Sequence, residues 1–370
     1  MKEEITIIGA GHQGLAMAAH LSSEGVACNL WNRTEQHIRD ILQTGQISCY
    51  GILEKETHVH QVSTDIRQVL TKHVMVTTPS TAHRDIAHML APLVDESYTI
   101  ILNPGRTFGA LDFYSCLREA GCTKMPVVAE TQTIIYTCRR DVKNSVRLYA
   151  IKNGVAIATV QPQQMTRAIK AIPQCIRSCF TPVNSSLVTS MSNVGMVLHC
   201  IPVLMNTGWI EAEHTNFEYY YSGISPSIAA LLERLDAERV SVASAMGCSV
   251  ETVKTWLQRT YHTTGDDLYQ NLQSNVYYRG IDAPKTIHHR YLEEDVPNGL
   301  VPLEDAGRIL GVPTPITSAA ISLASALMQV DYRKTGRKYG KLREFLEPLE
   351  PNEQTEAVPI QQKAETALGE

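Results

Sequence analysis

The stretch Ile5-Thr6-Ile7-Ile8-Gly9-Ala10-Gly11-His12-Gln13-Gly14 opens the chain with an apolar run that leads into three glycines. The run predicts a buried parallel strand, and the segment from Leu15 to Leu21 predicts a helix. Gly9 permits a tight turn, Gly11 lets backbone approach a pyrophosphate, and Gly14 allows close helix–strand packing. Because helix N-termini attract phosphates, we expect a dinucleotide site at Gly9, Gly11, His12, Gln13 and Gly14 rather than a purely structural turn.

The end of the second predicted strand, Ala27-Cys28-Asn29-Leu30-Trp31, bears on which dinucleotide binds. An NAD site usually has an acidic residue there to hold the ribose 2′-hydroxyl. This chain has Asn32, Arg33 and Thr34 instead, so no carboxylate stands there to repel a 2′-phosphate. Arg33 can stack on adenine or pair with that phosphate, although it can also be a solvated loop residue. The sequence therefore favours NADP(H), with NAD(H) as the alternative, bound by Asn32, Arg33 and Thr34.

The length and composition of the chain indicate a globular protein of two domains. It has 370 residues, 44% hydrophobic content and a formal net charge of −5. Alternating strand and helix patterns predict an α/β fold, with a Rossmann-type doubly wound sheet over residues 1–183. Strand patterns fade afterwards, so residues 184–347 are expected to form a mostly α-helical second domain. The polar segment 348–370 is expected to be a disordered tail.

Several classes of partner are not expected. The mild acidity argues against a nucleic-acid surface. Nine scattered cysteines without a CxxC pair indicate free thiols in a reducing compartment. No metal is expected, because Cys175 and Cys179 lack a second ligand pair and the adjacent His288 and His289 would point in opposite directions. The chain begins with a strand rather than a signal peptide, and no apolar run approaches a membrane span, so a cytoplasmic location is expected.

The first half contains the following predicted elements. Strands are expected over 74–77, 98–102 and 125–129, and helices over 82–90, 110–120 and 163–172. Two further runs, Ser145–Ile151 and Gly154–Val160, are predicted to form a β-hairpin that turns near Asn153-Gly154.

The second half shows three helix signals. Ser225-Pro226 is typical of a helix start, and this helix should continue to Ala245 and stop at Gly247. Pro302–Leu310 predicts another helix, ended by Gly311. Thr314-Pro315 starts a third, with small residues that favour a buried core over a dimer interface: Ala319, Ala320, Ser322, Ala324, Ser325 and Ala326. A homodimer is nevertheless possible.

Three loops follow predicted strands and should line one crevice, because ligands of open α/β sheets bind at the carboxyl ends of the strands. The loops are Thr77-Thr78-Pro79-Ser80, Leu102-Asn103-Pro104-Gly105-Arg106-Thr107 and Glu130-Thr131-Gln132-Thr133. We expect Thr78, Pro79, Asn103 and Gly105 to contact the cofactor. The alternative is that the prolines and glycines only make turns.

Two further segments combine with the glycine loop into a recognisable set. Alone, His199 in its apolar run would usually be a core histidine, and Asp295 near a proline would usually end a helix. The whole set is Gly9-x-Gly11-x-x-Gly14, Asn103-Pro104-Gly105-Arg106-Thr107, Glu130-Thr131-x-Thr133, His199-x-x-Pro202-x-x-x-Asn206-x-Gly208 and Arg290-Tyr291-Leu292-x-Glu294-Asp295-Val296-Pro297-x-Gly299-Leu300. It resembles the opine dehydrogenase family, also called the NAD/NADP octopine/nopaline dehydrogenase family, from residue 5 to about residue 315.

That resemblance implies an activity and a catalytic pair. Members of the family use NAD(P)H to condense the amino group of an amino acid with a 2-oxo acid, which yields secondary-amine dicarboxylates called opines. The resemblance implies that His199 and Asp295 are catalytic. An imidazole titrates near neutral pH and can move protons, and a carboxylate on its far nitrogen fixes the tautomer.

Substrate contacts are less determined. Two carboxylates need cations, and arginine forks suit them; the candidates are Arg106, Arg139, Arg140, Arg279 and Arg290. Arg290 is assigned instead to the cofactor pyrophosphate, where it would couple cofactor binding to domain closure. Thr133 and Cys138 are expected near the oxo acid, and Asn193 and Asn206 near the substrate carboxylate or amine. Each of these residues can equally have a structural role.

Two rival functions are weighed against this one. The first is another reductase of the 6-phosphogluconate-dehydrogenase-like group, such as a ketopantoate or glycerol-phosphate reductase, which relies on a catalytic lysine; no lysine accompanies the His199 segment. The second is a non-catalytic NADP(H) sensor, which has no need of a proton relay. The identities of the amino acid and the oxo acid stay open.

Overall fold

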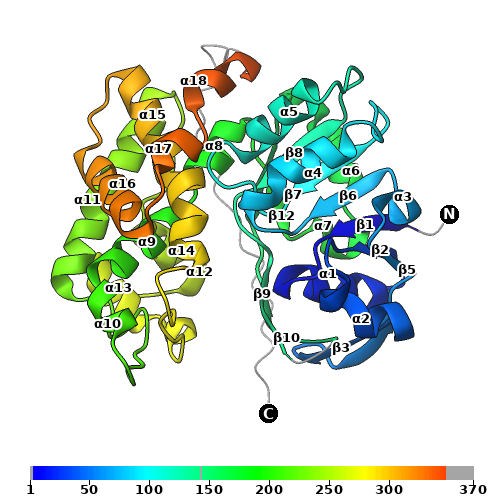
Figure 1. The fold of residues 1–370 in the computed structure, drawn as a ribbon, viewed down its shortest axis with the longest axis horizontal. Coiled ribbons are helices and arrows are strands. Elements are labelled where there is room, and N and C mark those ends of the chain that lie inside the picture. Colours follow the sequence, from blue (N-terminus) through cyan, green and yellow to red (C-terminus); the bar gives the residue numbers. More distant parts are fainter. Residues whose placement is uncertain (1–2, 142–143, 347–370) are drawn as a thin grey trace.

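The computed structural model describes residues 3–141 and 144–346 and has two lobes (Figure 1). One lobe is built on β-sheets and contains the N-terminal half of the chain. The other is built from helices, and β9 lies between the two (Figure 1). The predicted fold class, a Rossmann-type domain followed by a mostly α-helical domain, is confirmed.

The large sheet has eight strands in the order β12-β11-β8-β7-β6-β1-β2-β5. Neighbouring strands from β8 to β5 run parallel, and β11 runs antiparallel to β8. Strands β6, β7 and β8 cover the three predicted runs with boundaries shifted by one or two residues. The bounds are β1 Glu4–Ile8, β2 Ala27–Trp31, β5 Gln61–Ser63, β6 His73–Val76, β7 Thr99–Leu102, β8 Val127–Thr131, β11 Val155–Thr159 and β12 Phe180–Pro182.

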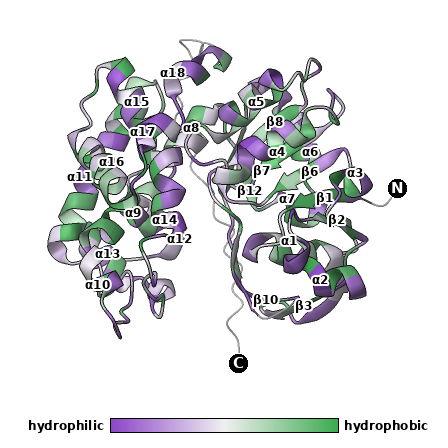
Figure 2. Ribbon diagram, in the orientation of Figure 1, coloured by the Kyte–Doolittle hydropathy of each residue, from purple (hydrophilic) through white to green (hydrophobic). Residues whose placement is uncertain are grey.

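Helices cover both faces of this sheet, which explains its nearly continuous apolar strands (Figure 2). Ile5 and Ile7 of β1 pack in one core with α1, whereas Ile8 faces a second core that continues into the helical lobe. The two lobes therefore share one hydrophobic core. The helices of this lobe are α1 His12–Ser23, α2 Glu35–Thr44, α3 Ile66–Val69, α4 His83–Leu90, α5 Gly109–Glu119, α6 Met165–Ala171 and α7 Gln174–Arg177, with 3₁₀ turns η1 Ser80–Ala82 and η2 Pro162–Gln164.

The predicted β-hairpin of Ser145–Ile151 with Gly154–Val160 is wrong. The first run, β10, belongs to a separate four-stranded sheet of order β4-β3-β10-β9, whereas the second run, β11, lies in the large sheet. The burial patterns explain the difference, because β10 packs one face on α1 while β11 is buried between β8 and β12. The other strands of the small sheet are β3 Gln46–Gly51, β4 Lys55–His58 and β9 Tyr136–Arg140.

The three helices predicted for the second half are present in the helical lobe as α11, α15 and α16. Helix α11 starts at Pro226, with the Ser225 hydroxyl accepting from the Ile228 amide, and Gly247 follows its end with φ of 79°. Gly311 ends α15 in the left-handed conformation. The helices are α8 Ser186–Met191, α9 Gly195–Met205, α10 Thr207–Glu211, α11 Pro226–Ala245, α12 Val253–Tyr261, α13 Leu268–Ser274, α14 Arg290–Glu293, α15 Val301–Leu310 and α16 Pro315–Met328, with the 3₁₀ turn η3 Val276–Tyr278 and the π-helical turn η4 Val296–Leu300.

Two expectations about apolar segments need correction. Ala320 and Ala324 of α16 are buried, but Ala319, Ser322 and Ala326 are exposed, so the small residues do not form one core stripe. The span Ser186–Met205 is long and apolar enough to cross a membrane by length and composition, contrary to expectation. Because 78% of its 18-residue apolar window is buried inside the protein, the span is accounted for as the core of the helical lobe. The predicted tail, 348–370, lies outside the described residues.

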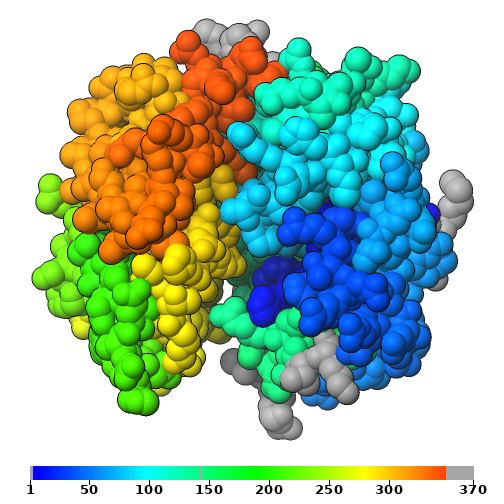
Figure 3. All heavy atoms as spheres, viewed as in Figure 1, coloured from blue at the N-terminus to red at the C-terminus, as the bar shows by residue number. Residues whose placement is uncertain are grey.

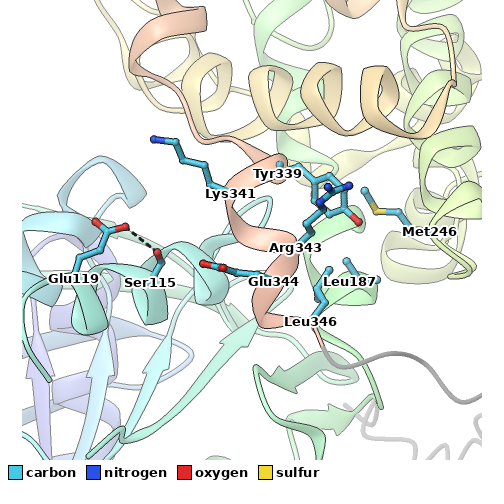
Figure 4. A pocket seen from close by; sticks show the side chains of 10 residues that line it. Ser115, Glu119, Leu187, Met246, Tyr339, Lys341, Arg343, Glu344 and Leu346 are labelled. Atoms are coloured by element: carbon cyan, nitrogen blue, oxygen red, sulfur yellow. Dashed lines mark hydrogen bonds between the residues drawn. The ribbon is translucent and has the colours of Figure 1, made fainter. Parts of the chain in front are cut away.

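The last described segment returns from the helical lobe to the nucleotide lobe. It comprises α17 Tyr332–Thr335, α18 Tyr339–Leu342 and η5 Arg343–Phe345. The buried Arg337 donates from Nε to Asp112 (3.1 Å) and from Nη1 to the Gly105 and Thr107 carbonyls (3.1 and 3.0 Å). An open hollow of about 860 Å³ lies beside this segment (Figure 4). Its lining comes from both lobes and shares no residue with the predicted site, so this hollow lies where the lobes meet, away from that site.

Candidate active site and cofactor site

The glycine loop has the backbone that its sequence predicts. Gly9 has φ of 108°, in the region that favours glycine. A Cβ on Gly14 would lie 1.7 Å from the Gly9 carbonyl oxygen, so only glycine allows α1 to start this close to β1. Nothing lies within 4 Å of a Cβ built on Gly11, which faces open space. The Asn32 side chain accepts from the Ala10 amide at 3.1 Å and steadies the loop from β2.

His12 and Gln13 lie at the start of α1, beside the small sheet. The His12 ring accepts from the Arg140 backbone amide at 2.6 Å, and Gln13 donates weakly to the Tyr136 carbonyl at 3.4 Å. Burial, and then the charges of Arg139, Arg290 and Arg140, lower the pKa of His12. Positive charge therefore surrounds the exposed glycine loop, as a pyrophosphate site requires.

A hollow of about 370 Å³ lies at the ends of β2 and β6, and all five residues predicted around it contribute to its wall. These are Asn32, Arg33, Thr34, Thr78 and Pro79. The exposed Arg33 guanidinium lies 3.7 Å from Asp85, a carboxylate of α4 that also lines the hollow. The hollow has the position and size for an adenosine group, and Asp85 is a contact that the sequence did not predict.

The two residues predicted to contact the cofactor from the loop after β7, Asn103 and Gly105, both have structural roles instead. Asn103 is buried, and its amide donates to the Ile101 carbonyl at 2.9 Å, so its side chain is turned into the protein. Gly105 is required by packing, because a Cβ there would lie 2.0 Å from the Glu130 carboxylate. Glu130 is itself buried and accepts from Thr189, Ser190 and the Ala110 amide.

His199 and Asp295 form the predicted pair. His199 lies on α9, and its Nδ1 is 2.8 Å from Asp295 Oδ2, which follows α14. Its Nε2 makes no hydrogen bond within the described part of the chain. Pro202 lacks the amide that would pair with the Leu198 carbonyl, and the buried Tyr219 hydroxyl donates to the Leu198 and His199 carbonyls instead (3.3 and 2.7 Å).

Aromatic rings fix the orientation of the imidazole. Tyr291 stacks on His199 with ring centroids 4.0 Å apart and an interplanar angle of 14°. His289 meets the Tyr291 ring edge-on at 4.5 Å. Burial lowers the pKa of His199 and outweighs the opposing effect of Asp295, and Arg290 and Arg106 lower it further. The imidazole is therefore neutral near pH 7 and can act as a base.

Glu294 joins the two lobes beside this pair. Its carboxylate accepts from the Ser80 amide (2.8 Å) and hydroxyl (3.0 Å), and it lies 3.4 Å from Arg106 and 3.2 Å from Arg290. Burial by itself would raise its pKa, but Arg106, Arg290 and the Ser80 hydrogen bonds hold that pKa well below the ordinary range. The carboxylate is therefore ionised, and it neutralises the two arginines.

Arg106, predicted to bind substrate, is consequently already paired. Its side chain is 12% exposed and bridges Glu294 and Asp295, at 3.4 and 3.8 Å. Its backbone has φ of 67°, which is unusual for a residue with a side chain. The Arg337 hydrogen bonds to the carbonyls on both sides of Arg106 hold this conformation.

The remaining predicted substrate residues differ in position. Asn193 lies in the site, where it contacts Arg106 (3.5 Å) and Thr107 (3.2 Å). Asn206 donates to the Pro202 and Gly223 carbonyls at the far end of α9, which is a structural role. Cys138 faces α1, and its thiol donates to the His12 carbonyl at 3.3 Å, with its pKa raised to about 12 by burial. Thr133 lies in the bend after β8.

The arginines predicted to bind carboxylates also differ in position: Arg290 lies near the site, whereas Arg140 and Arg279 have other contacts. Arg290 is half-exposed and pairs with Glu294 at 3.2 Å, and its charge contributes to the lowered pKa of His12 beside the glycine loop. Its contact with the cofactor pyrophosphate stays a prediction. Arg140 donates to the Ala10 and His37 carbonyls, and Arg279 lies over the Tyr221 ring. Within residues 3–141 and 144–346, no group of three or more histidine, cysteine or acidic side chains is placed to hold a metal.

Sequence reasoning missed Glu294, Tyr291 and Asp85 as members of the site. The first two lie inside the quoted motif that contains Asp295, so membership of that motif was the available signal. Asp85 had none, because only the packing of α4 against the end of β2 brings it to Arg33.

Comparison with known proteins gives two family matches. Residues 182–328 match the family model of the α-helical domain of NAD/NADP octopine/nopaline dehydrogenase. Residues 4–105 match the N-terminal domain of NAD-dependent glycerol-3-phosphate dehydrogenase.

Among individual relatives, an opine dehydrogenase of Arthrobacter sp. (strain 1C) is 35% identical over 91% of this chain and 94% of its own length. Octopine dehydrogenase in complex with NADH and agmatine has a similar fold, with a TM-score of 0.74 and 18% identity over 92% of this chain and 96% of that one. Yersinopine dehydrogenase with bound NADP⁺ gives a TM-score of 0.73 and 14% identity over 92% and 95%.

Proposed function

Because this chain belongs to the opine dehydrogenase family and is an NAD(P)-dependent oxidoreductase, we propose that it condenses an amino acid with a 2-oxo acid such as pyruvate, using NADPH, and catalyses the reverse oxidation. The observation that carries the proposal is the His199–Asp295 pair, held at 2.8 Å with Nε2 of the imidazole unpaired. A protein that only binds a dinucleotide has no need of such a pair. The glycine loop and the hollow of about 370 Å³ belong to one lobe and the catalytic pair to the other, and Figure 3 shows a groove between the two lobes.

The cofactor would supply the hydride, and His199 would donate or accept the proton. Joining an amine to a 2-oxo acid releases water, and reduction of the resulting carbon–nitrogen double bond takes up one hydride and one proton. His199 Nε2 is the group placed to give that proton, and to accept it in the oxidative direction. Asp295 accepts from Nδ1–H, so the proton that moves is the one on Nε2.

We also infer a reducing compartment, since all nine cysteines are free.

We predict that NADPH is oxidised only when an amine accompanies the oxo acid. Pyruvate or glyoxylate alone should give little turnover, because this chemistry needs the carbon–nitrogen double bond. Loss of NADPH absorbance with pyruvate, with and without each amino acid of a panel, measures this. Comparable reduction of the oxo acid alone would make the protein a hydroxy-acid dehydrogenase instead.

We predict that NADPH binds more tightly than NADH, because Arg33 stands where an acidic residue would repel the 2′-phosphate. Arg33→Glu should reverse the preference by about 10- to 100-fold, the value of a charged hydrogen bond. Asp85 opposes the phosphate, so Asp85→Asn should raise the preference for NADPH by a few-fold. Dissociation constants for both cofactors test this; equal affinities in the parent protein would refute the NADPH assignment.

We predict that Tyr291 acts through its ring rather than its hydroxyl. Tyr291→Phe keeps the stack on His199 and should retain kcat, whereas Tyr291→Leu should lower kcat by about 10-fold with little change in KM. The pH profile of kcat should shift in Tyr291→Leu alone, because loss of the ring admits water to the imidazole. Equal kcat values for the two variants would show that the stack does not orient His199.

A further inference from the structure

Two residues of the loop between β7 and α5 have left-handed backbones, although neither is a glycine. Arg106 has φ of 67° and Phe108 has φ of 57°. This region is unfavourable for a residue with a side chain, because the Cβ comes too close to a backbone carbonyl oxygen. Such conformations persist only where the surrounding structure holds them. The position of Arg106 therefore depends on what packs against this loop.

The last described segment of the chain packs against both residues. Arg337 is 1% exposed, and its Nη1 donates to the Gly105 and Thr107 carbonyls at 3.1 and 3.0 Å. These carbonyls flank the first left-handed residue, and the Tyr339 ring packs on the second, Phe108, with ring centroids 5.1 Å apart. Because Arg337 lies 230 positions from Thr107, long-range packing holds the loop in this conformation.

Arg337 also contacts the turn that carries Asp295. Its backbone amide donates to the Pro297 carbonyl at 3.0 Å, and Pro297 belongs to η4, which directly follows Asp295. A Cβ on Gly336 would lie 2.7 Å from the same carbonyl oxygen, so the two segments meet at backbone distance. One residue therefore joins the Arg106 loop to the Asp295 turn, through its side chain and its amide respectively.

The position of the Arg106 guanidinium matters because it lies beside the catalytic pair. Its Nη1 is 3.8 Å from Asp295. A Cβ on Gly195 would lie 2.8 Å from Arg106 Nη1 and 3.4 Å from His199 Cε1, so the guanidinium and the imidazole border the same point at the start of α9. Burial is the main cause of the lowered pKa of His199, and the charge of Arg106 lowers it as well.

The side chain of Arg106 has only long contacts of its own. It lies 3.4 Å from Glu294, 3.5 Å from Asn193 and 3.8 Å from Asp295, all beyond the length of an ordinary charge-assisted hydrogen bond. Its buried Nε makes no hydrogen bond to any residue that the structure describes. These contacts leave room for the guanidinium to shift, so the backbone at residue 106 decides where it lies.

We propose that Arg337 is a positioning residue for catalysis: by holding the carbonyls on both sides of Arg106 and the turn after Asp295, it sets where the guanidinium lies against the catalytic pair. This rests on the proposed function. Arg337 also pairs with the buried Asp112 at 3.1 Å, but a buried ion pair adds little net stability because desolvation offsets the attraction. The contacts to the loop are therefore the ones that matter for the reaction.

Steady-state kinetics in both directions test the proposal in Arg337→Gln and Arg337→Lys, with Arg333→Gln as the matched control. Arg333 lies on the same segment and binds both carboxylate oxygens of Glu304 at 2.7 Å, within the helical lobe. In Arg337→Gln, kcat should fall about 10- to 100-fold, the usual effect of misplacing a catalytic group. The KM for NADPH, and kcat in Arg333→Gln, should change by less than about twofold.

Arg337→Lys decides the matter if Arg337→Gln does not fold. Its ammonium keeps a charge beside Asp112 but cannot reproduce the fork that also reaches two carbonyls, so it should fold and still lose kcat. The double variant Arg106→Gln with Arg337→Lys should be no more than about twofold slower than Arg106→Gln, since Arg337 acts through Arg106. Losses that multiply would overturn the proposal.

The acid limb of opine oxidation is a readout that a purely structural role would not move. The charged and titratable groups facing the imidazole are the same in all Arg337 and Arg333 single variants: Asp295, Arg290, Arg106, His289 and Tyr291. If Arg106 moves away from the pair, the pKa of His199 rises. The oxidation rate should then fall at a higher pH in the Arg337 variants than in the parent or Arg333→Gln.

A measurement without turnover separates the two proposals. If the parent oxidises no opine, the proposed function fails, and ¹³C NMR titration of the His199 ring, assigned by its absence in His199→Ala, still decides the role of Arg337. A higher pKa in Arg337→Lys than in the parent would support the positioning role. If the parent is active and folded Arg337→Lys keeps the parental kcat and pH profile, the inference about Arg337 fails alone.

Discussion

Replacing His199 by alanine should lower the rate of reductive condensation by about 10²- to 10⁴-fold, the usual contribution of a positioned acid–base group. The affinity for NADPH should stay nearly unchanged, because the glycine loop and the adenosine hollow belong to the other lobe. Single-turnover and steady-state rates, with cofactor titration on the same preparation, measure both effects. Near-normal turnover in a folded, NADPH-binding variant would falsify the proposed mechanism.

Asp295→Asn should also lower turnover, because an amide can present its donor end to Nδ1 and favour the wrong tautomer. The double variant should be little slower than His199→Ala alone, since the two residues act as one unit. Losses that multiplied in the double variant would assign the two residues independent roles.

The pH dependence of the same reaction has a defined direction. Burial and two arginines lower the pKa of His199, so the imidazole stays neutral further into the acid range than an ordinary histidine of pKa 6.5. Oxidation of an opine needs the neutral base, and its rate should fall only as pH drops through this lowered pKa. Reductive condensation needs the protonated form, so its optimum should lie at lower pH. His199→Ala should lose this dependence in both directions.

Replacing Glu294 by glutamine should destabilise the protein by about 3–5 kcal/mol, the usual cost of leaving a buried charge without its partner. Arg106 would keep its charge while losing its nearest carboxylate, and the contact from Ser80 to the helical lobe would weaken. Catalysis should fall as well, since Arg106 is 3.8 Å from Asp295 and would be drawn towards it.

The neighbouring Glu293→Gln is the matched control for this prediction. Glu293 is exposed, and its one ion pair among the described residues is with His288, at 3.7 Å, so its replacement should leave the denaturant midpoint and kcat nearly unchanged. Chemical denaturation with and without NADPH measures the stability of both variants. Equal midpoints for Glu294→Gln and the parent would show that the carboxylate does not hold the lobes together.

The sequence by itself determined the elements whose reasons are local. Gly9 and Gly14 are dictated by a positive φ and by contact between neighbouring turns, and the caps of α11 and α15 are read from Ser225 and Gly311. The alternation of apolar strands and helices established the Rossmann lobe. The resemblance of two short motifs paired His199 with Asp295, which lie 96 positions apart.

Only the tertiary structure decided how the charges are shared. Arg106, an available carboxylate-binding residue in the sequence, is already paired because Glu294 reaches across the lobes to it. The Asn206 amide caps the end of its own helix by donating to the Pro202 carbonyl. The expected hairpin does not form, because β10 pairs with β9 and β11 pairs with β8 in different sheets. Such contacts join distant positions through burial and Coulomb interactions, which no local pattern of residues encodes.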